Sequence, residues 1–319
     1  MIADVCVGRY SALDEVVYGP IEDWNTGLIA DFSNAFRCQE TFNADLSRWD
    51  TGRATTMQGM FHGASAFNQD IGGWDVSRVT NMAYMFAHAH AFNQDLSRWD
   101  VSQVTDMAGM FADARLFDQS LRGWDVSRVR RMSWMFSNAR AFNQDCLREW
   151  DVSRVINMSY MFHGASSFDQ PLNDWDVSNV MFMSGMFSGA ARFDQQLDGW
   201  DVSSVTDMQD MFRGAARFLH PLGNWDVSKV QNMNYMFLDA RRFRLQSDIA
   251  ANWRPRALKS IVGIFNGTPG AATFGEAVER TCWLLEMRLR TWLGGDMGEA
   301  GGGRVSTKQT STCRFSSRR

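Results

Sequence analysis

Apolar and polar residues recur along this chain with a period of 25 residues over most of its length. A complete unit begins at Phe92 and reads FNQDLSRWDVSQVTDMAGMFADARL, and the next unit begins at Phe117. Such a period is typical of a repeat protein, in which each unit buries its apolar face against its neighbours. The clearest column in the aligned units consists of tryptophans: Trp24, Trp49, Trp74, Trp99, Trp124, Trp150, Trp175, Trp200, Trp225 and Trp253.

The second half of each unit carries the spacing of a helix. Met107, Met110, Phe111 and Ala114 stand at positions i, i+3, i+4 and i+7, which share one face of an α-helix. We therefore predict a short amphipathic helix in every unit. A column of serines precedes this stretch and is suited to N-caps or turns: Ser77, Ser102, Ser127, Ser153, Ser178, Ser203 and Ser228.

The first half of each unit favours extended structure. Leu96, Trp99, Val101 and Val104 lie in a segment rich in β-branched and aromatic residues, although the alternation is broken between Leu96 and Trp99. This segment predicts a short strand with a bend or bulge. The predicted fold is an α/β repeat, a leucine-rich-repeat-like solenoid of about ten units, each with one short strand and one short helix.

The repeat also divides the chain. We expect residues 1–23 to form an N-terminal cap or lead-in and residues 24–267 to form the solenoid. Residues 268–297 could supply a capping helix. The glycine-, serine- and threonine-rich residues 298–319 are predicted to be a disordered tail.

Composition excludes several classes of protein. A net charge of −4 over 319 residues provides no basic surface of the kind that nucleic acid requires. No stretch is long and apolar enough to predict a transmembrane segment, and MIADVCVGRYSALDE lacks the pattern of a signal peptide. The five cysteines occupy no shared repeat position, which favours ordinary thiols over a disulfide framework or a zinc site.

The repeated motif WDVSxVTxMxxMFxxAxxFNQDL resembles that of the BspA-like surface proteins and the related mycoplasma lipoprotein-type repeat, DUF285. The resemblance covers about residues 17 to 265. It implies a leucine-rich-repeat-like solenoid at the cell surface or secreted, used for adhesion or protein binding. It implies no catalytic residues.

Three polar or aromatic columns each have two interpretations. The aspartates after the tryptophans, from Asp50 to Asp226, could collect calcium, or each could accept backbone N–H groups in an Asx-turn. The turn is favoured because the unit lacks a glycine-rich ion loop. The Asn/Asp column from Asn43 to Asp194 is expected to satisfy turn amides. The tryptophans are expected to pack in the core, with an exposed sugar-stacking platform as the alternative.

Two outward columns are candidates for partner binding. Solvated charge, paired locally with the aspartate three residues earlier, is the alternative explanation for the basic column. Arg and Tyr are favoured interface residues, so the hypothesis is a surface for an acidic protein or a glycan. The basic column contains Arg53, Arg78, Arg128, Arg154 and Lys229, and the aromatic column contains Tyr84, Trp134, Tyr160 and Tyr235.

Evidence for catalysis is sparse. The five histidines are irregularly placed and are interpreted as surface residues, although His88 and His90 are close enough to bind a metal weakly. No catalytic or phosphate-binding motif is present, and no cofactor is predicted. We predict a non-enzymatic scaffold for protein–protein or cell-surface adhesion contacts. The alternatives are a structural spacer or surface-layer protein and a carbohydrate-binding module.

Overall fold

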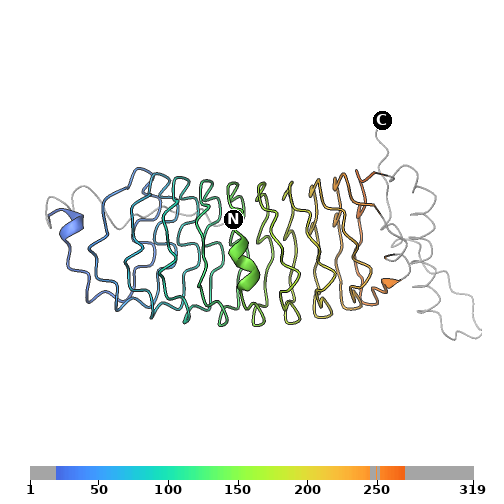
Figure 1. Cartoon of the computed structure of the whole chain (residues 1–319), viewed down its shortest axis with the longest axis horizontal. Coiled ribbons are helices and arrows are strands. Elements are labelled where there is room, and N and C mark those ends of the chain that lie inside the picture. Colours follow the sequence, from blue (N-terminus) through green and yellow to red (C-terminus); the bar gives the residue numbers. More distant parts are fainter. Residues whose placement is uncertain (1–18, 245–248, 250–251, 270–319) are drawn as a thin grey trace, which may run out of the picture.

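The computed structural model describes residues 19–244, 249 and 252–269. The chain winds into a row of similar turns, here called rungs, stacked along one long axis (Figure 1). Its named helices are two short 3-10 helices, η1 (Ile21–Asp23) at the N-terminal end and η2 (Asp145–Glu149) near the middle. Isolated parallel β-bridges join successive rungs at ten equivalent residues: Asp31, Thr56, Asn81, Asp106, Arg131, Asn157, Phe182, Asp207, Asn232 and Ser260.

The segment predicted as an amphipathic helix is a series of tight turns. The N–H of Met110 donates to the carbonyl of Met107 (3.2 Å), and that of Ala114 donates to the carbonyl of Phe111 (3.1 Å). Gly109, the third residue of the first turn, has a φ of 61°, as a type II turn requires. These turns bury Met107, Met110, Phe111 and Ala114 completely. They therefore satisfy the i, i+3, i+4, i+7 spacing without a helix.

Hydrogen bonds between rungs explain why turns replace the helix. The N–H groups of Gly109 and Phe111 donate to the carbonyls of Ser133 (2.8 Å) and Met135 (2.9 Å) in the next rung. An α-helix would use these N–H groups within the segment. Backbone N–H groups in this segment therefore alternate between closing turns and joining neighbouring rungs. The prediction of a helix here is wrong.

The predicted bent strand is also replaced by turns. The N–H of Trp99 donates to the carbonyl of Leu96 (3.1 Å), and that of Val104 donates to the carbonyl of Val101 (2.9 Å). Bridge pairing is confined to single residues such as Asp106. The tandem solenoid is confirmed, whereas the strand and helix assigned to each unit are not.

Columns of stacked aromatic rings fill the core. Successive phenylalanines of the column that contains Phe111 have ring centroids 5.4–5.7 Å apart. Within a rung, Phe111 also stacks on Phe117 at 4.0 Å. The tryptophans from Trp49 to Trp253 are only 2–9% exposed, which confirms their role in the core.

The tryptophan column is also hydrogen-bonded. The indole N–H of Trp175 donates to the carbonyl of Leu147 in the preceding rung (2.8 Å), and equivalent bonds recur in other rungs. The exception is Trp150, whose buried Nε1 has no partner. Its unit contains an extra residue beside Cys146, and η2 occupies that stretch. The insertion is therefore accommodated at the cost of one hydrogen bond.

Several predictions concern the ends and the cysteines. Of the predicted lead-in, residues 19–23 are described and include η1, while the capping helix beyond residue 269 and the tail at 298–319 lie outside the described residues. Cys38 is disulfide-bonded, so the prediction of ordinary thiols is wrong for that residue. Cys146 is a buried free thiol, as predicted.

The indole hydrogen bond predicts unequal effects of two matched substitutions. Trp175→Phe removes a bond to Leu147, whereas Trp150→Phe removes no bond from its indole nitrogen. Trp175→Phe should therefore lower the free energy of unfolding by about 1 kcal/mol more than Trp150→Phe. Denaturant titrations of the two variants measure this difference, and equal losses would contradict the assigned role of the bond.

Candidate functional site

The aspartates of the WD motif form turns. The N–H of Ser77 donates to Oδ1 of Asp75 at 3.0 Å. The Ser77 hydroxyl and N–H together lower the pKa of Asp75. The Asx-turn interpretation is confirmed, and the serines are turn formers. Among the described residues, no three of these carboxylates lie close enough to share an ion. The same bond occurs at Asp50, Asp100, Asp125, Asp151, Asp176, Asp201 and Asp226.

The Asn/Asp column joins rungs to one another. The N–H of Asn93 donates to Oδ1 of Asn68 at 2.8 Å, and Oδ1 of Asn93 accepts the N–H of Asp118 at 2.9 Å. This confirms that the column satisfies turn amides. Both polar columns are therefore structural, and the candidates for function are the residues that point outward.

The basic column lies exposed along the solenoid. Arg128 donates to the side chain of Gln103 in the preceding rung, which shows that equivalent positions are neighbours. Within the described part of the chain, none of the five basic residues forms an ion pair with a carboxylate. Without a direct ion pair, hydrogen bonds from Ser77 and Ser127 and, after them, the charges of Arg78 and Arg128 lower the pKa of Asp75 and Asp125. The aspartate three residues earlier is therefore still an electrostatic neighbour of these basic residues. The column contains Arg53, Arg78, Arg128, Arg154 and Lys229.

The aromatic column occupies an unusual backbone position. Tyr84, Trp134, Tyr160 and Tyr235 have φ values of 58°, 63°, 59° and 55°. Such values favour glycine and are rare for bulky residues. The same position in other rungs is occupied by Asn34, Gly59, Gly109, Gly185, Asp210 and Gly263, all with positive φ. The recurrence of glycine here was the sequence signal for this conformation.

Each tyrosine ring leans over the next rung. The ring of Tyr84 occupies the space that a side chain on Gly109 would need, and Tyr160 does the same at Gly185. Trp134 instead meets Tyr160, and their rings stack with centroids 4.1 Å apart. Tyr84 and Trp134 remain 40% and 38% exposed.

In each rung, a short segment follows the β-bridge residue and carries the aromatic column, as Tyr84 follows Asn81. We call the outward-facing surface of these segments the ladder face. His163 contacts both rings of the Trp134–Tyr160 stack edge-on at 6.1 and 5.8 Å. At the bridge position of the following rung, Phe182 is an exposed apolar residue. Burial and the charges of Asp210 and Asp207 raise the pKa of Tyr160. The ladder face thus combines exposed aromatic rings with nearby carboxylates.

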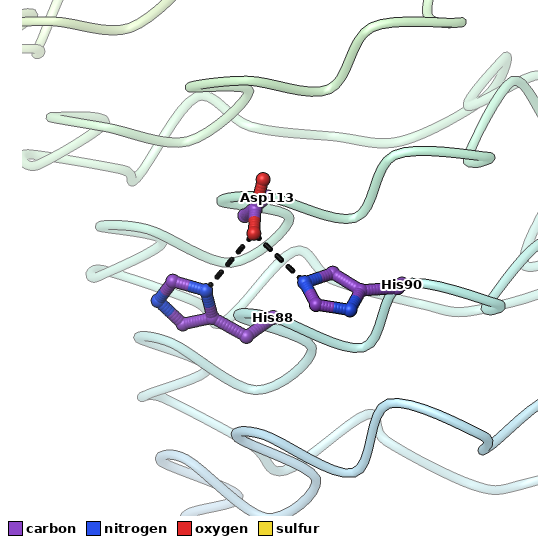
Figure 2. A group of neighbouring side chains, drawn as sticks. All are labelled: His88, His90 and Asp113. Atoms are coloured by element: carbon purple, nitrogen blue, oxygen red, sulfur yellow. Dashed lines mark hydrogen bonds and ion pairs between the residues drawn. The ribbon is translucent and has the colours of Figure 1, made fainter.

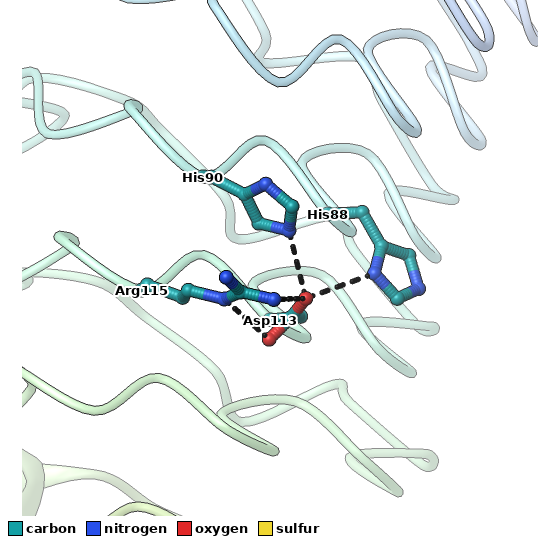
Figure 3. Close-up of polar contacts among 4 residues, drawn as sticks. All are labelled: His88, His90, Asp113 and Arg115. Atoms are coloured by element: carbon teal, nitrogen blue, oxygen red, sulfur yellow. Dashed lines mark hydrogen bonds and ion pairs between the residues drawn. The ribbon is translucent and has the colours of Figure 1, made fainter. Parts of the chain in front are cut away.

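A second cluster lies on the same face. Oδ2 of Asp113 contacts Nδ1 of His88 (3.2 Å) and Nε2 of His90 (2.8 Å), as Figure 2 shows. Arg115 binds both oxygens of Asp113, each at 3.1 Å (Figure 3). Burial of Asp113 opposes ionisation, but hydrogen bonds from Arg115, His90 and His88 outweigh it and lower the pKa of Asp113 to about 2.

The sequence pointed to only half of this cluster. His88 and His90 stand out by their spacing, whereas Asp113 and Arg115 lie 25 residues further along. That step is one full rung, so the repeat period could have paired them. The described residues contain no other group of three His, Cys, Asp or Glu side chains that could hold a metal ion.

The stacked rungs and repeated motif define a tandem-repeat solenoid protein. The chain belongs to the family described as "Mycoplasma protein of unknown function, DUF285", whose model matches residues 8–123, 109–207 and 172–277. This match confirms the resemblance drawn from the repeat. No curated protein matches the chain.

Two of the solved structures that match the chain are distant likenesses. A leucine-rich repeat protein from Eubacterium ventriosum is 11% identical, with 69% of this chain and 75% of that chain covered and a TM-score of 0.31. A TLR13–ssRNA13 complex is 9% identical, with 69% and 50% covered and a TM-score of 0.22. Neither likeness is close enough to carry a conclusion. Among the described residues, no helix has the length and apolarity needed to cross a membrane.

The lean of each ring over a glycine predicts coupling between neighbouring rungs. Gly109→Ala places a Cβ at a φ of 61° and against the Tyr84 ring. It should cost about 1–2 kcal/mol for the backbone alone, plus the clash. In a Tyr84→Gly background the cost should be smaller, because the ring is gone.

Denaturant titrations of the two single variants and the double variant give the coupling energy. Gly73→Ala is the matched control, because a Cβ there meets nothing within 4 Å. Additive effects of Gly109→Ala and Tyr84→Gly on the free energy of unfolding would contradict the contact.

Proposed function

We propose that this protein is a non-enzymatic scaffold whose ladder face binds another protein, with Tyr84, Trp134 and Tyr160 as the main contact residues. The observation that carries the proposal is the placement of aromatic side chains at positive φ, with Tyr84 and Trp134 exposed and Tyr160 partly buried against Trp134. A family of unknown function and a solenoid of repeated rungs are compatible with this role.

The energy of the backbone supports a role beyond folding. A non-glycine residue in the left-handed region costs about 1–2 kcal/mol. Glycine occupies the same position in four other rungs, at Gly59, Gly109, Gly185 and Gly263. The fold therefore accepts glycine at this position, and the aromatic residues stand there against the local preference of the backbone. An interaction with a partner supplies a reason for them.

The chemistry of the surface favours a protein as the partner. Trp, Tyr and Arg are the residues that most often dominate the binding energy of protein interfaces. Small residues such as Ser133 and Ser159 lie beside the aromatic column, so a partner can approach the rings closely. Phe182, the bridge residue of the rung after that of Tyr160, and Met181 just before it add exposed apolar surface, at 38% and 41%.

The basic column supports an acidic character of the partner. Its five side chains are exposed and form no direct ion pair within the described residues, although Arg78 and Arg128 act electrostatically on Asp75 and Asp125. Exposed charges of this kind can attract an acidic partner. Charges at the rim of an interface mainly accelerate association and select partners. We therefore assign the basic residues to attraction and the aromatic residues to affinity.

Two rival functions fit the aromatic column less well. A spacer or surface-layer protein has no need of exposed rings in a strained backbone position. A sugar-binding platform needs open ring faces, but Trp134 stacks directly on Tyr160 at 4.1 Å. Adhesion at a cell surface, which the family resemblance implies, remains the setting in which we expect the scaffold to act.

Glycine substitutions test the proposal with little effect on the fold. In Trp134→Gly and Tyr160→Gly the backbone gain of about 1–2 kcal/mol offsets the loss of the Trp134–Tyr160 stack, about 0.5–1.5 kcal/mol, so these variants and Tyr84→Gly should have a stability close to that of the wild type. The combined variant should bind a protein partner at least about tenfold more weakly than the wild type, a loss of about 1.4 kcal/mol. The matched control is Leu116→Ala, which removes an exposed apolar residue outside the aromatic column.

The measurement has two stages. Proteins from surface extracts of the source organism are captured on the wild type and on each variant, and the strongest ligand is purified for biosensor titration. Loss in the glycine variant with retention in Leu116→Ala supports the proposal. Absence of any saturable protein ligand would favour the spacer, and saturable binding on a glycan array alone would favour the carbohydrate-binding module.

A further inference from the structure

The side chains of His88, His90 and Asp113 converge on one point of the ladder face. His88 and His90 come from one rung, and Asp113 comes from the next (Figure 2). Their ligand atoms, Nδ1 of His88, Nε2 of His90 and a carboxylate oxygen of Asp113, all lie within 4.8 Å of one another. We propose that these three atoms bind a divalent transition metal ion of the zinc class.

The ligand atoms need only small shifts to share an ion. Zinc lies about 2.0–2.2 Å from nitrogen and carboxylate ligands in a tetrahedral arrangement, so neighbouring ligand atoms around it are about 3.3–3.6 Å apart. Oδ2 of Asp113 is 3.2 Å from Nδ1 of His88, close to that spacing, and 2.8 Å from Nε2 of His90. The Asp113–His90 distance must lengthen by about 0.5 Å and the two imidazole nitrogens must approach each other for the ion to enter.

The backbone holds two of the ligands in place. His88 and Asp113 have φ values of 59° and 55° and stand at equivalent positions of consecutive rungs. Their N–H groups donate to the carbonyls of Ala112 (2.7 Å) and Ser137 (2.6 Å) in the following rungs. The equivalent position is glycine in several other rungs, including Gly63 and Gly164. The ligands are therefore carried by a rigid backbone that does not itself require them.

The side-chain chemistry also suits the zinc class. Two imidazoles and one carboxylate are ligands that zinc, copper and nickel accept, whereas calcium and magnesium prefer oxygen alone. The side chain of Asp113 is only 13% exposed, and its Oδ2 faces both imidazoles. Asp113 is the negatively charged ligand of the set.

Arg115 opposes the ion and limits its affinity. Its guanidinium binds both carboxylate oxygens, and it contributes a positive charge close to the proposed site (Figure 3). The Arg115 side chain is 47% exposed, so it can leave Oδ2 while its Nε stays on Oδ1. Removal of this charge should therefore strengthen metal binding. If the cluster had only a structural role, no gain in metal affinity would be expected.

Three protein ligands leave the ion at least one open position for water or for a side chain of a partner. His88 lies four residues after Tyr84 in the same rung, so the site borders the aromatic column. The metal site does not rest on the proposed function, because its ligands belong to this chain alone.

The test is calorimetric titration of ZnCl2 into the full chain after treatment with a chelator. The wild type should bind one equivalent at this site, and His90→Ala and Asp113→Asn should each weaken that binding by at least about tenfold. Arg115→Gln should bind zinc more tightly than the wild type. The matched control is His220→Ala, because His220 contacts Asp194 at 3.5 Å without a third ligand.

Two further measurements keep the outcome clear. Circular dichroism melts of the metal-free variants establish that each one is folded, and Co²⁺ absorption distinguishes imidazole and carboxylate ligands from cysteine thiolates. Zinc affinity in His220→Ala should equal that of the wild type. Equal zinc binding by the wild type and a His88→Ala/His90→Ala variant, no saturable binding at all, or a thiolate-to-cobalt band in the wild type overturns the proposal.

Discussion

Backbone hydrogen bonds between rungs are the constraint on which this structure depends. Amides such as those of Gly109 and Phe111 donate to the next rung, so each rung must follow the path of its neighbour. Identical paths place equivalent residues in columns, and the columns fill the core with stacked rings. The stack tolerates the extra residue beside Cys146, because η2 accommodates it and, among the buried indole groups that the structure describes, that of Trp150 alone lacks a partner.

The sequence predicted the buried positions well and the backbone poorly. Met107, Met110, Phe111 and Ala114 are buried as expected, but the spacing i, i+3, i+4, i+7 also fits overlapping four-residue turns. Periodicity reports which side chains point inward and cannot separate these two backbones. Recurrent glycine at the position of Gly109 was the available clue, since helices disfavour glycine while a type II turn requires a positive φ.

The repeat period also allowed part of each candidate site to be predicted from the sequence. The aromatic column was visible because its members recur at the repeat period, but its strained backbone and the stack of Trp134 on Tyr160 were not. The histidine cluster needed a comparison of residues one rung apart, which links His88 to Asp113. In a solenoid, residues separated by one period are neighbours in space as reliably as adjacent residues are in the chain.

The position of each tyrosine ring over the glycine of the next rung also limits how the sequence of such a protein can change. Tyr84 needs the empty space above Gly109, so the outer surface of a rung is compatible with only some successors. The cores, by contrast, repeat closely from rung to rung. Unequal recombination between repeats would therefore preserve the packing of the core and change the outer surface only where two repeats are newly joined. New surfaces in this family would then arise from new pairs of adjacent repeats, without any new kind of repeat.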